Sequence, residues 1–196
     1  MDSSAPYAAS KDRVLRAVGL NLVNFQRLEK ILKWLAELRP ITGSVPEINK
    51  QLELRRQSTQ RSTLGAIIPL WLETAYGQKP QLANPKTDLD VVIAFWLQLN
   101  IPAQVLDQHA RQLDQLLTER NWFVHTGLAE IDFDSNEACE ALLARLGEQN
   151  KRVIKQIDFL HSILDRIHEL SQFCASDDVQ EIIRTEMFGK REPSST

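Results

Sequence analysis

The sequence predicts an all-α protein built as an elongated bundle of four or five helices. Apolar residues recur at steps of three and four over long stretches of the chain, which is the period of an amphipathic helix. Only seven glycines occur among the 196 residues, and this argues against a turn-rich β fold. The connections between the apolar stretches are of modest length, as they are in helical bundles.

The first helix is expected to begin at Ser10 or Asp12 and to end at Leu38, with residues 1–10 as a flexible N-terminus. The stretch RPITGS, which contains a proline and a glycine, would end it. Its expected apolar face consists of Val14, Leu15, Val18, Leu22, Phe25, Leu28, Ile31, Leu32 and Leu35.

A second helix is expected to start near Pro46, with Ser44 as its N-cap. It would continue through the apolar stretch AIIPLWL, and Gly65 and Pro69 are expected to break or kink it. The following residues 77–88 contain two prolines and a glycine and predict a loop.

Residues 89–101 permit both a strand and a helix. Val91, Val92 and Ile93 are β-branched and favour a strand. The length of the stretch and the neighbouring helices favour a helix, and a helix is what we expect here.

A third helix is expected from Pro102, which suits a first turn, to about Val124 or His125. A long fourth helix would follow a cap at Asp134 or Ser135. Both fit an elongated bundle.

The end of the chain predicts a last short helix over 177–188 and a flexible tail at 189–196. Residues 11–188 together predict a single helical domain. The net charge of −3 argues against binding of nucleic acid through bulk charge, although it permits a local basic groove.

The cysteines and the apolar runs bear on the cellular setting. Cys139 and Cys174 form no C-x-x-C pair, so neither a disulfide framework nor a zinc site is expected. The N-terminus lacks the apolar region of a signal peptide, and the longest apolar runs are too short to span a bilayer. We therefore expect a cytoplasmic protein without a membrane partner.

The end of the third helix carries polar residues in unexpected places. On an ideal helix Arg120 falls within the apolar stripe, and Asn121 and His125 form an i, i+4 pair at its edge. Trp122 falls on the outward face, where a partner surface would explain it. The stripe itself consists of Leu106, Leu113, Leu116, Leu117, Phe123 and Val124.

These residue types suit chemistry at a phosphate. Arginine binds phosphate and stabilises charge that develops on it, and histidine transfers protons at neutral pH. Together they allow metal-free attack of a ribose 2′-hydroxyl on its own phosphate. Arg120 and His125 are about 140° apart on an ideal α-helix, so two copies of the helix paired across a two-fold axis would enclose a phosphate better than one.

The stretch RNWFVH at residues 120–125 resembles the R-x(4–6)-H signature of the HEPN superfamily, in its R-N-x-x-x-H ribonuclease form. Glu119 before it and Gly127 after it approximate the flanking family pattern, with Thr126 inserted before the glycine. The stretches GLNLVNFQRLEKILKWL and RSTLGAI are also similar to family segments. The likeness thus extends over much of residues 12–170, and only the short motif is chemically specific.

The resemblance implies a HEPN-like bundle that dimerises and brings two motif helices to a shared cleft. Active members are endoribonucleases that need no metal or cofactor, leave 2′,3′-cyclic phosphate ends, and often act as toxins or in phage defence. Arg120 would hold the scissile phosphate, His125 would shuttle the proton or stabilise the 2′-oxygen, and Asn121 would orient one of them. Some members carry a tyrosine that a partner antitoxin modifies, but Gly127 occupies that position here.

Two other interpretations remain open at this point. An inactive HEPN-like module would use the same helix for dimerisation, for a nucleotide or for a partner chain. An unrelated helical adaptor would pair Arg120 with a buried carboxylate. Any control of a nuclease would come from another chain, such as an antitoxin or a regulatory subunit.

Other polar residues have plainer expectations. Arg55, Arg56 and Arg61 lie close together on the expected second helix and are candidates for binding the RNA backbone, although a solvated face is the commoner explanation. Glu119 is expected to be solvated or to form a salt bridge. His109 falls on the apolar stripe and is expected to be a hydrogen-bonded core histidine.

Overall fold

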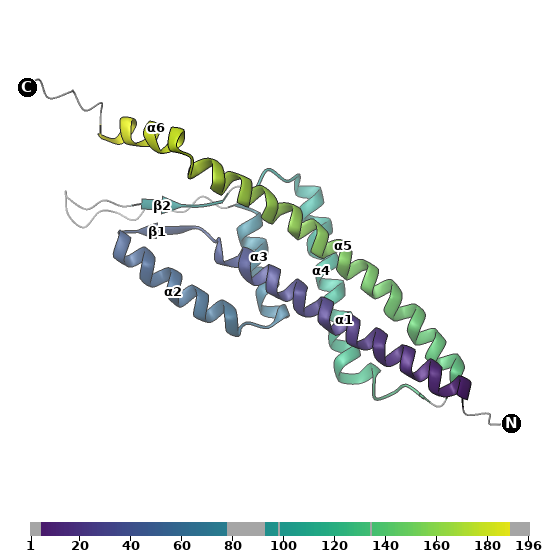
Figure 1. Ribbon diagram of the computed structural model, residues 1–196. Helices are drawn as coiled ribbons and strands as arrows, with labels where there is room; N and C mark the ends of the chain where they lie inside the picture. Colours follow the sequence, from purple (N-terminus) through teal and green to yellow (C-terminus); the bar gives the residue numbers. More distant parts are fainter. Residues whose placement is uncertain (1–4, 78–92, 98, 134, 189–196) are drawn as a thin grey trace, which may run out of the picture. The chain divides into compact units, whose positions relative to one another are not determined.

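The structure is a computed structural model that describes residues 5–77, 93–97, 99–133 and 135–188. It is almost wholly helical, as the sequence predicts (Figure 1). None of the helices among these residues has the length and apolar character needed to cross a membrane. The elements are α1 (Ala5–Glu37), β1 (Ile41–Gly43), α2 (Val45–Arg61), α3 (Leu64–Ala75), β2 (Ile93–Phe95), α4 (Ala103–Trp122), the π-helical turn η1 (Phe123–Gly127), α5 (Asn136–Cys174) and α6 (Asp177–Phe188).

The chain divides into two compact units, Met1–Asp158 and Phe159–Thr196. The boundary lies inside α5, whereas the sequence predicted one domain over 11–188. The candidate site belongs entirely to the first unit. The tail expected at 189–196 lies outside the described residues.

Helix α1 begins at Ala5, earlier than the start at Ser10 or Asp12 that the sequence predicts. Ser10 lies within the helix, and its hydroxyl donates to Asn136 Oδ1 at 2.6 Å. Most of the expected apolar face is buried, but Leu15 and Leu22 are 50% and 37% exposed.

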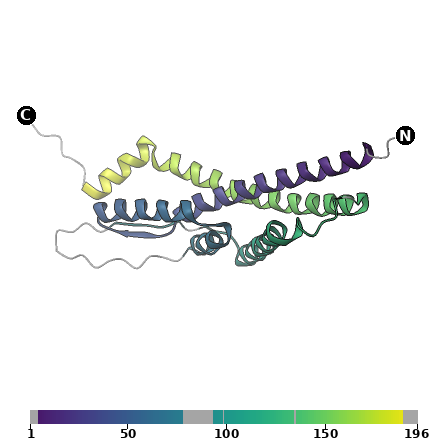
Figure 2. The same cartoon turned by 90° about the horizontal axis from the view of Figure 1, so that it is seen from below.

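Helix α1 and the first part of α5 lie side by side and run in the same direction (Figures 1 and 2). Asn21 Nδ2 donates to the carbonyl of Leu146 at 3.0 Å, and Asn24 Nδ2 donates to Asn150 Oδ1 at 2.7 Å. Both asparagines are almost completely buried. Buried amides need partners, so these bonds fix the register of the parallel pair.

The segment after α1 forms a short antiparallel ladder with β2. Ile41 pairs with Phe95 and Gly43 pairs with Ile93. The helix expected over 89–101 is therefore wrong at β2, where the β-branched character that favoured a strand prevails and β1 provides the pairing edge. Residues 78–92, with most of the expected loop, lie outside the described part of the chain.

Helices α2 and α3 correspond to the single broken helix that the sequence predicts. The expected N-cap is confirmed, because the Glu47 carboxylate accepts hydrogen bonds from the backbone amide of Ser44 at 2.9 Å and from its hydroxyl at 2.8 Å. The break falls between Arg61 and Leu64, just before Gly65. Pro69 lies inside α3.

Helix α5 begins where the sequence predicts. The Ser135 hydroxyl accepts a hydrogen bond from the amide of Ala138 at 3.2 Å, which confirms this residue as the cap. In the second unit α5 ends at a turn in which the Ser176 hydroxyl donates to the carbonyl of Phe173 at 2.7 Å. The expected last helix then follows as α6.

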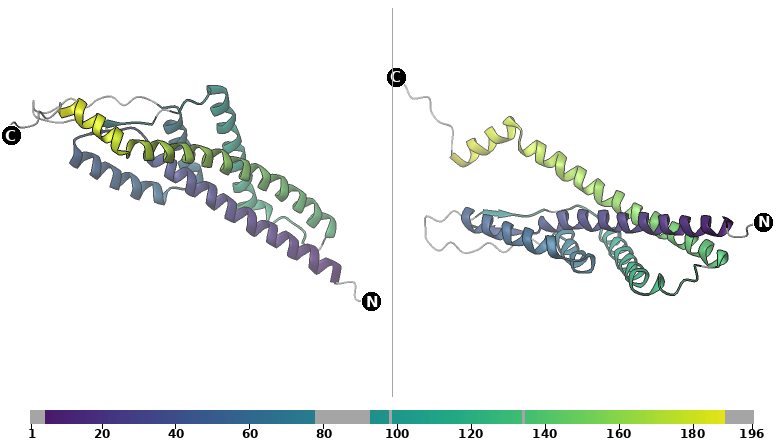
Figure 3. Two further views of the ribbon diagram at one scale, coloured as in Figure 1. Left: turned by 45° about the horizontal axis from the view of Figure 1, so that its top comes forward. Right: turned by 60° about the horizontal axis from the view of Figure 1, so that its bottom comes forward.

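The core of the first unit has two parts. Helices α3 and α4 lie on one side of α1 and supply the larger part of the core with it (Figure 3). The smaller part lies beneath η1 and contains Val14, Val18, Phe123, Cys139, Leu142 and Leu146. The candidate site therefore rests on its own apolar cluster.

Candidate functional site

The motif RNWFVH spans the end of α4 and the start of a π-helical turn. In η1 the carbonyl of Phe123 accepts a hydrogen bond from the amide of Leu128, five residues on, at 3.3 Å. π-Helical turns are rare, and they occur frequently at functional sites. This local distortion is thus the first independent sign that the motif is more than a helix end.

The π-turn changes the angle between the two candidate catalytic groups. Residues in an α-helix advance by about 100° each, which separates Arg120 and His125 by about 140°. A wider turn advances less per residue, so His125 lies closer in angle to Arg120 than the sequence predicts. The π-turn thus reduces the angle that separates Arg120 from His125 on an ideal helix, which favours binding of one phosphate by both side chains.

The structure brings Arg120 and Asn121 together and leaves His125 on the surface. Arg120 Nη1 donates to Asn121 Oδ1 at 3.1 Å. Arg120 is half-buried, and Asn121 and His125 are exposed. His125 makes no hydrogen bond to any other described residue, so its imidazole is accessible to a ligand.

The apolar stripe continues through the π-turn differently from what the sequence predicts. Val124 was expected to be buried and is 41% exposed, whereas Phe123 is buried as expected. Arg120 lies at the edge of the core and not in its middle.

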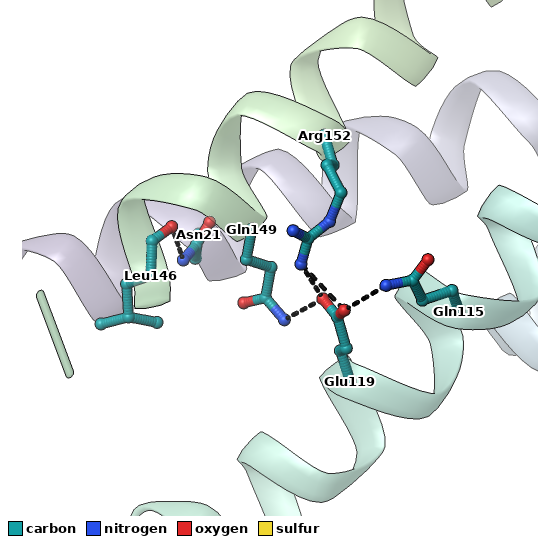
Figure 4. Close-up of polar contacts among 6 residues, drawn as sticks. All are labelled: Asn21, Gln115, Glu119, Leu146, Gln149 and Arg152. Atoms are coloured by element: carbon teal, nitrogen blue, oxygen red, sulfur yellow. Dashed lines mark hydrogen bonds and ion pairs between the residues drawn. The ribbon is translucent and has the colours of Figure 1, made fainter. Parts of the chain in front are cut away.

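Glu119 is a salt-bridge partner, one of the two roles expected for it. Its carboxylate accepts two hydrogen bonds from Arg152 Nη2, at 2.8 and 2.6 Å (Figure 4). Gln115 and Gln149 donate to the same carboxylate at 2.9 and 3.3 Å. Partial burial acts to raise the pKa of Glu119, but the bonds from Arg152 and the two glutamines outweigh it and lower that pKa.

This cluster fixes the end of α4 against α5. Glu119 directly precedes Arg120, so the ion pair holds the backbone that carries the motif. The arginine that pairs with Glu119 is thus Arg152 and not Arg120. Arg120 itself has no carboxylate partner within the described part of the chain.

Trp122 is half-buried within the chain and does not project outward as expected. Its ring packs against the apolar cluster beneath η1. The guanidinium carbon of Arg145, on α5, lies 3.7 Å from the ring centroid, in cation–π contact. The unexpected tryptophan is thus explained by contacts within the chain, because α5 and the residues after η1 cover that side of α4.

Gly127 lies against the six-membered ring of the Trp122 indole. A Cβ built on Gly127 would lie 2.4 Å from Cζ3 of Trp122 and 2.6 Å from its Cη2, which is closer than real Cβ atoms come. The indole therefore occupies the space that any side chain at Gly127 would need. Sequence reasoning missed this pair, although the spacing of five between a large aromatic and a glycine matches the repeat of a π-turn.

His109 is a hydrogen-bonded core histidine, as the sequence predicts. Trp71 Nε1 donates to His109 Nε2 at 3.0 Å, and His109 Nδ1 lies 2.5 Å from Gln156 Oε1. One ring nitrogen accepts and the other donates, which only a neutral imidazole can do. Burial lowers the pKa of His109 to about 4, so it stays neutral at physiological pH.

The three arginines of α2 differ in their surroundings. Arg55 donates to the backbone carbonyls of Glu37, Arg39 and Pro40 and so closes the end of α1. Desolvation by burial lowers its pKa. The guanidinium of Arg55 is already hydrogen-bonded to these carbonyls, so Arg55 is a poor candidate for binding the RNA backbone.

Arg56 and Arg61 are exposed and have no ion-pair partner among the described residues. Leu117 Cδ2 lies 3.4 Å from the Cβ position of Gly65, while Trp71, farther along α3, contacts α4 at His109. Helix α3 therefore runs antiparallel to α4. Its start, with Arg61 just before it, lies toward the motif end of α4.

Within the described part of the chain, no group of three or more histidine, cysteine, aspartate and glutamate side chains is placed to hold a metal ion. Comparisons with models of known protein families, with curated proteins and with solved structures give no significant match. The functional argument therefore rests on residues 119–127 and the side chains around them.

Proposed function

We propose that this chain is a HEPN-like, metal-independent endoribonuclease that leaves 2′,3′-cyclic phosphate ends and acts as a toxin or phage-defence effector. One observation carries the proposal: a fixed cation and an accessible imidazole stand on one exposed π-distorted helix end. An ion pair does not explain the cation, because Arg120 has no carboxylate partner within the described part of the chain.

The proposed reaction divides the work among three side chains. Arg120 binds the scissile phosphate and stabilises the charge that develops on it, because a guanidinium matches phosphate oxygens. His125 moves the proton of the 2′-hydroxyl or stabilises that oxygen. Asn121, already bonded to Arg120, holds the guanidinium or the substrate in orientation.

Two copies of the motif would complete the proposed active site. A two-fold axis beside the exposed face of the motif would present Arg120 of one chain and His125 of the other to the same phosphate. Arg61 lies toward the same end of the bundle and would guide the RNA backbone, together with Arg56. The acidic net charge is compatible with such a local basic surface.

The proposal is tested by cleavage of total RNA in excess EDTA, followed by end-group analysis. Wild type should leave cyclic-phosphate ends, and Arg120→Ala and His125→Ala should cut at least about 10³-fold more slowly. Arg111→Ala, on an exposed face of the same helix, and His161→Ala, on α5, are matched controls that should cut normally. Equal cleavage by wild type and both motif variants would refute the assignment.

A second candidate is an inactive HEPN-like module that binds a nucleotide or a partner chain. The observation that favours it is the missing hydrogen bond between His125 and the pair formed by Arg120 and Asn121. This module would bind a nucleotide in an Arg120-dependent manner, by calorimetry, and cut no RNA under any condition. Cleavage that depends on His125 would exclude it.

A further inference from the structure

A second set of side chains surrounds the motif and has no part in the proposed chemistry. The indole of Trp122 lies against Gly127 and is also in contact with the guanidinium of Arg145. Trp122 is the last residue of α4, and Gly127 is the last residue of η1. The indole therefore bridges the two ends of the turn that contains His125.

A π-turn needs an external reason to persist. It contains one more residue than an α-helical turn, and an isolated helix prefers the α register. Here the larger turn makes room for a ring beside Gly127, and the contact with Arg145 ties that ring to α5. The ring also packs on the apolar cluster beneath η1, which fixes it from below.

We propose that Trp122, through its contacts with Gly127 and Arg145, is a positioning residue that keeps residues 123–127 in the π-helical register. It thereby sets the place of the His125 imidazole relative to Arg120. The catalytic consequence rests on the proposed nuclease function, whereas the structural consequence does not. Loss of the indole or crowding of Gly127 would return the turn toward the α register and rotate His125 away from Arg120.

A double-mutant cycle tests the contact. Gly127→Ala places a methyl group where the indole lies, and Trp122→Leu removes the ring. Each single change should lower kcat for RNA cleavage by about 10- to 100-fold with little change in KM, because misplacement of a catalytic group has that effect. In the Trp122→Leu background, Gly127→Ala should have little further effect, since the indole ring that the new methyl group would meet is absent.

Two further variants control the cycle. Gly147→Ala places a methyl group at another glycine, on α5, where nothing lies within 4 Å of the new atom, and it should leave cleavage unchanged. Arg145→Gln removes the cation above the ring without adding bulk, and it should lower kcat in the same direction by a smaller factor. It serves as the test if Gly127→Ala fails to fold.

NMR of the histidine rings gives a readout that does not need activity. The His125 ring signals, assigned with His125→Ala, should shift in Gly127→Ala and Trp122→Leu, while those of His161 and His168 stay in place. If wild type cuts no RNA but the His125 signals move, the nuclease proposal fails and the positioning role stands. If neither the His125 signals nor cleavage change, the positioning role is refuted.

Discussion

Helix α4 and the π-turn η1 that continues it carry two polar regions that differ in how completely their atoms are paired. Around His109 every ring nitrogen has a partner, and the network extends through Gln156 to Gln112 at 2.6 Å. Sixteen residues farther along the chain, His125 stands exposed without a hydrogen bond to any described residue. Because a fully paired buried group stabilises a fold and an accessible unpaired one is available to a ligand, the comparison separates a structural histidine from a candidate catalytic one.

The sharpest test of this difference is the same substitution at both histidines. His109→Leu should lower the free energy of unfolding by about 2–4 kcal/mol, because it leaves the indole N–H of Trp71 and the amide oxygen of Gln156 buried and unpaired. His125→Leu should change it by less than about 0.5 kcal/mol, as exposed substitutions do. Urea unfolding measures both, and equal losses would abolish the distinction.

The pH dependence of stability should also distinguish the two regions. Because the pKa of His109 falls from 6.5 to about 4 in the folded chain, the unfolded chain binds a proton first as the pH falls. Neutral His109 therefore makes a pH-dependent contribution of about 3 kcal/mol to the free energy of unfolding. This contribution is complete above pH 6.5 and decreases as the pH falls from 6.5 to 4.

The measurement is the unfolding free energy at pH 7 and at pH 4.5, for wild type and for His109→Gln. The variant should lose less stability on acidification than wild type, since it lacks the titrating ring. Parallel pH curves for the two proteins would show that His109 is not held neutral by burial.

A smaller effect is expected at Glu119, which lies between the two regions. Glu119→Gln keeps the shape and removes the charge that Arg152 binds, and it should cost about 1–2 kcal/mol of unfolding free energy because the pair is partly exposed. A cycle with Arg152→Gln isolates the coupling. A coupling energy near zero would mean that the pair does not hold α4 to α5.

The smallest expected effect separates two glycines. Gly147→Ala should raise the unfolding free energy by up to about 1 kcal/mol, since alanine suits a helix interior and nothing opposes the methyl group. Gly127→Ala should lower it, because the added atom meets the indole. Thermal unfolding of the two variants compares them, and a shift of the same sign in both would count against the packing of Trp122 on Gly127.

The features that the sequence predicts correctly depend on local periodicity. The helices, the cap at Ser44, the paired Glu119 and the core position of His109 all follow from spacing along one helix. The features it misses depend on distant partners. β2 is a strand because β1 lies beside it, and Trp122 is half-buried because Arg145 of α5 covers it.

The candidate site shows both situations within eight residues. The motif residues are recognisable from their types, but the π-turn that contains His125 depends, in our proposal, on the contact of Trp122 with Gly127. A helical wheel drawn with about 100° per residue cannot represent that turn, because residues in a π-turn advance by a smaller angle. Val124, which the helical wheel places on the apolar stripe, is 41% exposed.

The parallel pairing of α1 with α5 has a consequence for synthesis on the ribosome. Ser10 and Asn24 bind residues 126 positions farther along the chain, so the buried face of α1 lacks this cover until the chain has reached residue 150. At translation rates of about 5–20 residues per second, that delay is on the order of ten seconds. During that time the apolar face of α1 is exposed, and the proposed active site lacks the helix α5 that holds it in place.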